Sequence, residues 1–312
     1  MTHNRVFVGI DVGKFEYCVY WQGLSQPFSL PNTSAGHKEL VRRLGNCEEQ
    51  RIAIEPTGGC EWALWEVLER EGFDVRQVSA AHVRAFARSL GNLAKTDPLD
   101  ARLIARFIAF RPDTGRRLPL KILRKLNVLT TKRRQLVAAK KKLSCQIKQR
   151  GSQEIADLDE AHMILLTQQI KLLETRIEQL LQSDEAIKRR AQILRSVPGI
   201  GPVLSAALIG QMPELGSLGE KQIAALAGLA PINSDSGKYS GKRHIKGGRP
   251  WLRHLLYQAA LVASNHNPTL TAFAKRLKQN GKPHKLVLIA VARKLIIIAN
   301  ALIAKNVLWK VA

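Results

Sequence analysis

Signals for β-strands occur only in the first part of this 312-residue chain, and this division strongly constrains its fold. Before Pro112, five short apolar or β-branched runs alternate with helix-forming segments at 35–44 and 61–71. The runs are Val6–Ile10, Tyr17–Trp21, Phe28–Leu30, Arg51–Ile54 and Asp74–Val78. Such alternation predicts a mixed sheet flanked by helices, with a hairpin first and crossover connections later. Residues 1–115 are therefore predicted to form an α/β domain.

After Pro112 the pattern is helical, which predicts all-α structure for the rest of the chain. Ile122–Arg150 contains no Gly or Pro, and Gly151-Ser152 separates it from a second helix at about 154–190. That helix carries a heptad-spaced apolar stripe, formed by Leu166, Ile170, Leu173, Ile177 and Leu180. The stripe is equally typical of an antiparallel hairpin or oligomerising coiled coil and of the core of a helical domain. We divide this part into a basic helix and coiled-coil region, 116–190, and a mainly helical C-terminal domain, 191–312.

Positive charge is concentrated in two blocks of the sequence. The chain has 49 Lys and Arg against 25 Asp and Glu, a net charge of +24. Residues 1–115 sum to zero, 116–150 to +13, 151–235 to −4 and 236–312 to +15. A helix with only basic charges would repel itself unless a polyanion lay alongside. This predicts a nucleic-acid partner, and because aromatic residues are few, contacts to the backbone of structured RNA or duplex DNA should dominate.

The cations expected to contact nucleic acid lie in these two blocks. They are Lys132, Arg133, Arg134, Lys140, Lys141 and Lys142 in the first block, and Lys238, Lys242, Arg243 and Arg249 in the second. In the second block they occupy a glycine-punctuated segment at 234–250, which suits close approach to a phosphate backbone. The preceding turn, Pro198–Pro202, resembles a helix-hairpin-helix phosphate-binding turn, and a plain interhelical turn is an equally good interpretation.

Cysteine spacing and the absence of a leader pattern predict a cytoplasmic protein. Cys18, Cys47, Cys60 and Cys145 lack metal-ligand spacing and are expected to be free thiols. The segment Leu286–Ala304 has the apolar character of a membrane span, but Arg293 and Lys294 lie at its centre. Each would cost roughly 2.5–3.5 kcal/mol in a bilayer. We therefore expect a soluble amphipathic helix there and no membrane partner.

Four carboxylates of the first domain stand where a metal site would place them. Asp11 ends the first strand and Glu55 ends the fourth, while Asp97 and Asp100 are three residues apart at a helix start. Residues at i and i+3 share a helix face, and Mg²⁺ prefers hard oxygen ligands of this kind. One or two ions held there would assist phosphoryl transfer. Asp97-Pro98 with Asp100 is also a good capping sequence, and Asp11 and Glu55 also suit a turn and a strand end.

These motifs resemble those of the DEDD-type bacterial insertion-sequence transposases. The resemblance rests on 8–14, 54–58 and 95–101 in the first domain, and on 197–202, 227–231, 236–238 and 247–249 in the last. It covers nearly the whole chain and is weakest in the coiled-coil region. It implies a ribonuclease H/RuvC-like first domain in which Asp11, Glu55, Asp97 and Asp100 bind Mg²⁺.

The same resemblance reassigns Ser236, which the residues alone favour as an ordinary loop serine. It implies that Ser236 attacks DNA and forms a phosphoserine intermediate, completing a composite active centre with the carboxylate site. It also implies a noncoding bridge RNA that pairs with donor and target DNA, and synapsis implies a homo-oligomer, a dimer or tetramer. The expected function is thus RNA-guided DNA strand cleavage and exchange. The alternatives are a RuvC-like nuclease acting by hydrolysis without a serine nucleophile, and a non-catalytic nucleic-acid-binding scaffold.

Overall fold

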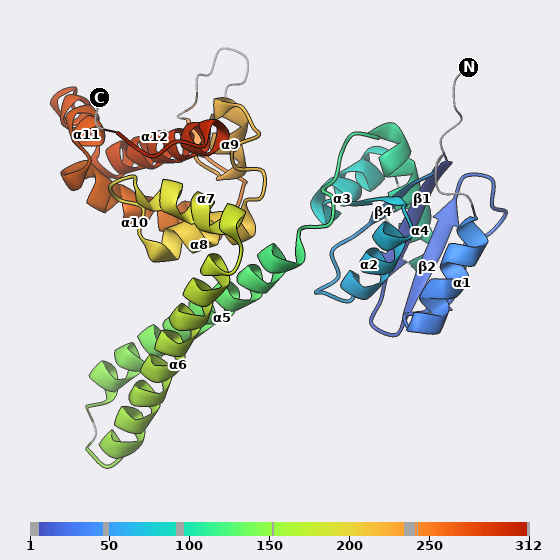
Figure 1. Ribbon diagram of the computed structural model, residues 1–312, viewed down its shortest axis with the longest axis horizontal. Coiled ribbons are helices and arrows are strands. Elements are labelled where there is room, and N and C mark those ends of the chain that lie inside the picture. Colours follow the sequence, from blue (N-terminus) through green and yellow to red (C-terminus); the bar gives the residue numbers. More distant parts are fainter. Residues whose placement is uncertain are drawn as a thin grey trace. The chain divides into compact units, whose positions relative to one another are not determined.

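The computed structural model describes residues 6–45, 50–91, 97–151, 153–233, 241 and 243–310. The chain divides into two compact units, Met1–Pro119 and Leu120–Ala312. The first is α/β and the second is helical apart from two very short strands (Figure 1). The boundary lies four residues beyond the expected end of the first domain, and the helical hairpin belongs to the same unit as the C-terminal helices. The further division of that unit at residue 190 stays a prediction.

A five-stranded mixed sheet forms the centre of the first unit. Its strands are β1 (Val6–Val12), β2 (Glu16–Trp21), β3 (Phe28–Pro31), β4 (Gln50–Ile54) and β5 (Asp74–Gln77), in the spatial order β3-β2-β1-β4-β5. The pairs β1–β2 and β2–β3 are antiparallel, while β1–β4 and β4–β5 are parallel. The predicted strands, the initial hairpin and the later crossovers are confirmed. This layout is compatible with the expected ribonuclease H-like fold.

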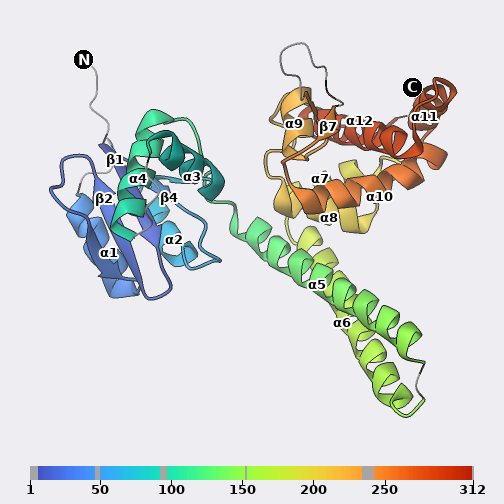
Figure 2. The same ribbon diagram turned by 180° about the vertical axis from the view of Figure 1, so that it is seen from behind.

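Helices cover both faces of this sheet (Figure 1 and Figure 2). On one face, α1 (Ser34–Leu44) and α2 (Trp62–Arg70) bury Leu40 and Trp65 against Val8, Ile10 and other strand residues. On the other face, α3 (Ala80–Ser89) and α4 (Asp97–Phe110) bury Val83, Ile104 and their neighbours against Ala53. Because strand side chains alternate between faces, the central strands β1 and β4 contribute to both layers.

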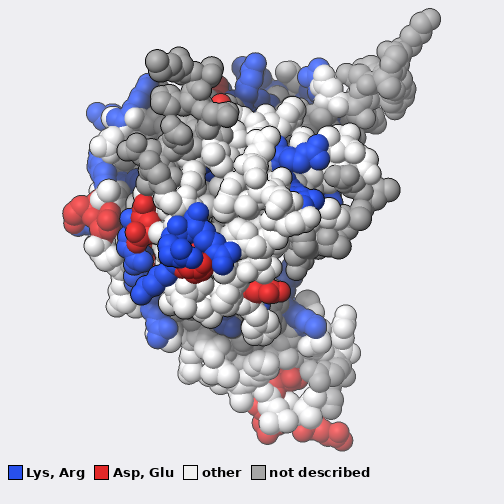
Figure 3. Space-filling model, turned by 90° about the vertical axis from the view of Figure 1, so that its right-hand side faces the viewer, with Lys and Arg blue, Asp and Glu red and all other residues white. Residues whose placement is uncertain are grey.

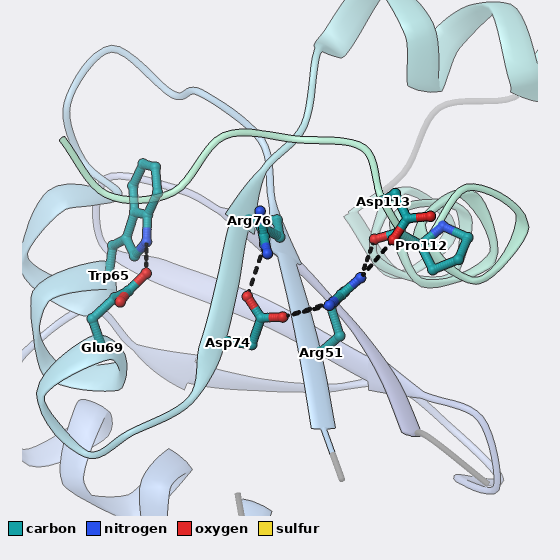
Figure 4. A network of polar contacts seen from close by, with 7 residues as sticks. All are labelled: Arg51, Trp65, Glu69, Asp74, Arg76, Pro112 and Asp113. Carbon is teal, nitrogen blue, oxygen red and sulfur yellow. Dashed lines mark hydrogen bonds and ion pairs between the residues drawn. The ribbon is translucent and has the colours of Figure 1, made fainter. Parts of the chain in front are cut away.

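An ion-pair network joins the parallel strands β4 and β5 (Figure 4). Arg51 of β4, only 9% exposed in its side chain, pairs with Asp74 of β5 at 2.7 Å. Asp74 also accepts a hydrogen bond from Arg76 at 2.7 Å, and Arg51 donates to the carbonyl oxygen of Pro112. The network thereby fixes the segment that follows α4 to the sheet.

The second unit begins with a helical hairpin. Its helices are α5 (Lys121–Arg150) and α6 (Ala156–Gln182), joined through Gly151 at a φ of 61°. Leu136 and Leu143 of α5 pack against Leu166 and Leu173 of α6 in one small core. Further along the predicted stripe, Ile177 and Leu180 pack with the larger core of this unit. The first part of the stripe therefore packs within the hairpin, and its last part belongs to the core of the helical unit. A role of the stripe in oligomerisation stays a prediction.

The remaining helices form a bundle around α12. They are α7 (Glu185–Arg195), α8 (Pro202–Gln211), α9 (Glu220–Leu226), α10 (Pro250–His266), α11 (Pro268–Gln279) and α12 (His284–Lys305). Among the described residues, α12 is the one helix long and apolar enough to cross a membrane. In the structure, Val287, Val291, Leu295 and Ala299 of this helix lie in the main core, and Lys294 is exposed. Its apolar composition is thus explained by packing inside the unit.

Two expectations about secondary structure were wrong. The predicted continuous helix at about 154–190 is divided, because the Asp184 carboxylate accepts a hydrogen bond from the Ile187 N–H at 2.9 Å and caps a new helix, α7. The β signal also does not stop at Pro112, since β6 (Pro231–Ile232), just before the glycine-rich segment, pairs with β7 (His244–Ile245) inside it. Strands of two residues carry no periodic pattern that a sequence can reveal.

Candidate functional site: a carboxylate cleft in the first unit

The alternation of side chains along β1 and β4 places two predicted metal ligands on the α4 face of the sheet. Ile10 of β1 and Ile54 of β4 are paired in register and point into the α1–α2 core. Asp11 follows Ile10 in β1, and Glu55 follows Ile54 at the end of β4. Both residues therefore belong to the opposite face of the sheet. Because the two strands are parallel, both carboxylates lie at the same edge of the sheet.

Helix α4 brings a third carboxylate to this edge. Gly9 of β1 is paired with Ala53 of β4, and both are small. A Cβ on Gly9 would collide with the Ala101 carbonyl oxygen and the Ala105 nitrogen, so α4 lies directly on the β1 backbone. Asp100 immediately precedes this contact and is 9% exposed. The close approach of the helix therefore determines where Asp100 lies.

Asp11, Glu55 and Asp100 line one open cleft of about 730 Å³. Its other walls come from the β1–β2 turn, the end of β3 and the segment that follows Glu55. Asp97 begins α4 one turn before Asp100, and its side chain lies outside the described residues. The structure thus brings three of the four predicted carboxylates to one cavity.

The donor set fits a hard divalent cation, although the described carboxylates do not form a closed cage. Carboxylate oxygens are the ligands that Mg²⁺ takes in proteins, usually with several waters or substrate phosphates completing its shell. In the described part of the chain, no three His, Cys, Asp or Glu side chains are grouped closely enough to hold a metal ion. Binding at this cleft would therefore need Asp97, substrate oxygens or a small closure of the carboxylates.

Two cationic side chains accompany the carboxylates in the cleft. The Arg84 guanidinium of α3 lies 3.9 Å from an Asp100 oxygen. Lys14, in the turn after β1, also lines the cleft and is exposed. These charges reduce the repulsion among neighbouring carboxylates and favour the approach of an anionic substrate. Sequence reasoning missed Arg84 because it is 16 positions before Asp100 and carries no motif.

A buried glutamate supports the segment that carries Glu55. Glu61 is 2% exposed and accepts hydrogen bonds from the Thr57 N–H at 3.2 Å and the Gly59 N–H at 2.9 Å. Its second oxygen accepts from the Gln77 amide at 3.0 Å. A buried carboxylate with three donors is an efficient clamp for a loop, because leaving these donors unpaired would be costly. No local pattern in the sequence distinguishes Glu61, which precedes α2, from the acidic residues of that helix.

Asn32 connects the two loops that border the cleft. Its amide donates to the Gly13 carbonyl at 3.0 Å and to the Cys60 carbonyl at 3.1 Å. Its oxygen accepts from His37 Nε2 at 2.8 Å. Burial lowers the pKa of His37, which keeps the ring neutral near pH 7. The turn after Asp11 and the segment after Glu55 are thereby fixed to one another.

The predicted nucleic-acid contacts of α5 divide into exposed and internally bound cations. Lys132, Lys141 and Lys142 are exposed and Lys140 is half-buried. Arg133 instead donates two hydrogen bonds to Glu174 of α6, at 2.9 and 2.6 Å. The Arg134 guanidinium lies 5.3 Å from the centre of the Trp251 ring of α10. These two arginines therefore connect α5 to other helices. On the face drawn in Figure 3, positive and negative side chains lie close to one another among large uncharged areas.

The second basic block shows the same division. Arg243 is exposed, whereas Arg249 forms a bidentate pair with Glu214, at 2.9 and 2.7 Å. Ser236, Lys238 and Lys242 lie outside the described residues. At the turn between α7 and α8, Val197 and Ile200 are buried and a Cβ on Gly199 would meet Ala263 of α10 at 2.6 Å. This packing explains the turn structurally, and a phosphate contact there stays a prediction.

Comparison with known proteins identifies two family profiles along the chain. A profile described as "Transposase" matches residues 8–150, and one described as "Transposase IS116/IS110/IS902 family" matches residues 191–275. A pilin gene-inverting protein of Moraxella lacunata is 29% identical, over 97% of each chain. An uncharacterized protein of insertion element IS116 from Streptomyces clavuligerus is 25% identical, over 94% of this chain and 93% of its own length. An uncharacterized protein of IS900 from Mycobacterium paratuberculosis is 34% identical over 39% of this chain and 29% of its own.

Proposed function

The chain belongs to the IS116/IS110/IS902 family of transposases, enzymes that cleave DNA and transfer its strands, and we propose that its carboxylate cleft is the metal-dependent part of that activity. The observation that carries the proposal is that Asp11, Glu55 and Asp100 line one cavity. They reach it from a strand, a strand end and a helix, and the cleft lies wholly within the segment matched by the first profile. If these carboxylates served only as a helix cap, a turn residue and a strand end, they would not need to line the same cavity.

Each carboxylate has a proposed role as an oxygen ligand. Asp11, Glu55 and Asp100, with Asp97 beside them, would hold Mg²⁺, whose chemistry is to neutralise charge on a phosphodiester and to activate the attacking oxygen. Glu61 and Asn32 are positioning residues, because they hold the loops next to Glu55 and Asp11. Arg84 and Lys14 would favour the approach of the DNA backbone.

We further propose Ser236 as the nucleophile, on the resemblance of its motif. Its hydroxyl oxygen would form a bond to phosphorus as the bridging P–O bond to one strand end breaks, and the hydroxyl proton would leave with that end. The reverse attack by a hydroxyl of the other DNA would then join the strands. Gene inversion, which the name of the Moraxella relative describes, requires that every broken strand be rejoined. A covalent ester retains the energy of the phosphodiester, whereas hydrolysis would leave ends that need ligation.

RNA guidance is part of the same proposal. The exposed lysines of α5 and the basic residues near 236–249 would contact the phosphates of a bridge RNA and of donor and target DNA. Sequence choice would then rest on base pairing, and the low aromatic content of the chain leaves few side chains on which bases could stack. A homo-oligomer would hold the two DNA segments together.

A covalent-adduct assay tests the nucleophile. The protein is incubated with its RNA, DNA and Mg²⁺, and a protein–DNA adduct is sought on a denaturing gel. We expect the adduct in wild type and in Ser240→Ala, a control hydroxyl of the same segment, and its loss in Ser236→Ala. Cleavage without an adduct in Ser236→Ala would favour the hydrolytic alternative.

The metal ligands are tested separately by strand transfer. Asp11→Ala and Asp100→Ala should abolish it while leaving RNA binding intact, whereas Asp113→Asn, an exposed acid outside the cleft, should retain it. Full recombination in both cleft variants would refute the metal-site proposal.

A further inference from the structure

An exposed aromatic side chain stands at the edge of the carboxylate cleft. Phe15 lies in the turn after β1 and lines the same cavity as Asp11, Glu55 and Asp100. Its exposed fraction is 78%, the highest among the large apolar side chains that the structure describes. Exposing an aromatic ring forgoes the favourable free energy of burial, so a position of this kind calls for an explanation.

The backbone that carries this ring is held by several hydrogen bonds. The Gly13 N–H donates to the Glu16 carbonyl at 2.8 Å and closes the turn. The Asn32 N–H donates to the Phe15 carbonyl at 2.8 Å, and the Asn32 side chain holds Gly13. The exposed ring is therefore carried by an ordered turn whose backbone is anchored to the end of β3. Such anchoring reduces the conformational entropy lost when a ligand contacts the ring.

A positive charge that could bind a nucleotide phosphate lies beside the Phe15 ring. The Lys14 ammonium is 5.2 Å from the centre of the Phe15 ring. An aromatic face takes any base by stacking, and a neighbouring ammonium takes the phosphate. The carboxylates that line the same cleft would repel the phosphates of a bare nucleotide, so the ring and the lysine identify where in the cleft a base would rest.

We propose that Phe15 stacks on an unpaired DNA base next to the scissile phosphate, and that Lys14 contacts the phosphate of that nucleotide. The inference rests on the proposed function of the cleft and specifies how its substrate is held. Stacking requires a base that has left the duplex, so the strand entering the cleft is locally unpaired. Phe15 is a positioning residue, since it contacts the substrate away from the reacting atoms.

Photocrosslinking with the full chain tests this without any cleavage step. A short oligodeoxynucleotide containing 5-iododeoxyuridine is bound in EDTA and irradiated, and the crosslinked peptides are identified by mass spectrometry. We expect a crosslink at Phe15 and at the tryptophan of Phe15→Trp, and its loss in Phe15→Leu, which keeps apolar bulk without a π face. Phe110→Ala removes an aromatic of the same unit that is 69% exposed and does not line the cleft, so it should leave the Phe15 crosslink unchanged.

Binding measurements supply the second readout. With the short single strand, Phe15→Ala should weaken binding about 5- to 150-fold, the range for removing one stacked base. Wild-type affinity in Phe15→Ala, or wild-type affinity in Phe15→Leu, would overturn the inference. If a Phe15 variant keeps its DNA affinity but has a lower molar mass in light scattering, Phe15 belongs to a protein–protein contact and the inference is also overturned. These assays are independent of the strand-transfer test, because EDTA prevents cleavage. A missing Phe15 crosslink would therefore not refute the carboxylate site. Conversely, a refuted carboxylate site would not remove the Phe15 crosslink.

Discussion

Gly9 of β1 faces the Ala101 carbonyl of α4 so closely that no side chain fits between them. This contact allows α4 to lie on the strand that carries Asp11, and it places Asp100 at the same edge. A glycine in the middle of a strand is normally unfavourable, so its presence here indicates close packing of the two backbones.

Gly9→Ala should therefore displace α4 and impair the cleft. We expect a loss of stability of about 1–3 kcal/mol or more from overpacking, because the new methyl group meets backbone atoms that cannot rotate away. DNA cleavage should fall by more than the unfolded fraction explains. Denaturant unfolding and a cleavage assay at a temperature where the variant is folded provide the measurements. Gly219→Ala, where the added Cβ meets only the Gln222 side chain at 3.5 Å, is the control and should retain cleavage.

Removal of the buried carboxylate at Glu61 should loosen the Glu55 segment. Glu61→Ala leaves the buried Gln77 amide without its acceptor, at about 1–3 kcal/mol, and frees the half-buried N–H groups of Thr57 and Gly59. Glu61→Gln should have an intermediate effect, since its amide oxygen can still accept. Hydrogen exchange at Gly59 should accelerate in Glu61→Ala. Unchanged exchange there would show that Glu61 does not hold the loop.

Acid should destabilise the first unit through Asp74. Burial alone would raise the pKa of Asp74, but the hydrogen bonds and charges of Arg76 and Arg51 outweigh it and lower this pKa below its ordinary value. A lowered folded-state pKa stabilises the fold above the unfolded-state pKa, and this stabilisation is lost as pH falls through the folded-state pKa. The loss should therefore occur below about pH 4.

Comparison of Asp74→Asn with Asp113→Asn isolates this effect. Asp74→Asn should lower stability at pH 7 by roughly 1–3 kcal/mol and flatten the acid limb of the stability curve, because Arg51 loses its carboxylate partner. The fully exposed Asp113 lies 3.8 Å from Arg51, so Asp113→Asn should change little. If stability falls with pH equally in wild type and in Asp74→Asn, the acid sensitivity does not come from Asp74.

The exposed lysines and the paired arginines of α5 should differ in their effects on nucleic-acid binding. Lys141→Gln with Lys142→Gln should reduce the slope of log affinity against log salt by up to about 2, since each phosphate contact contributes roughly 0.9 for a duplex. The thermal midpoint should be unchanged. Arg133→Gln should instead lower the midpoint, because it breaks the contact with Glu174, and leave the salt slope nearly as it was. Salt titrations and thermal scans distinguish the two classes.

Local pattern was sufficient for the five strands of the first unit, for α1 and α2, and for the positions of Asp11 and Glu55 near strand ends, but it did not predict α3. These depend on alternation over a few residues and on parallel register, which repeat with a fixed period. The division of the long helix at Asp184 was missed, because a capping side chain in the middle of an apolar pattern is a weak signal against heptad spacing.

Contacts between distant residues were decided by tertiary structure alone. Nothing near Arg133 or Arg249 in the sequence indicates that Glu174 and Glu214 bind them, so both were expected to contact nucleic acid. Glu61, Asn32 and Arg84 likewise gain their roles from partners brought close by folding. Side-chain type and spacing determine which residues are able to do chemistry, whereas the packing of α4 on Gly9 determines which of them share a cleft.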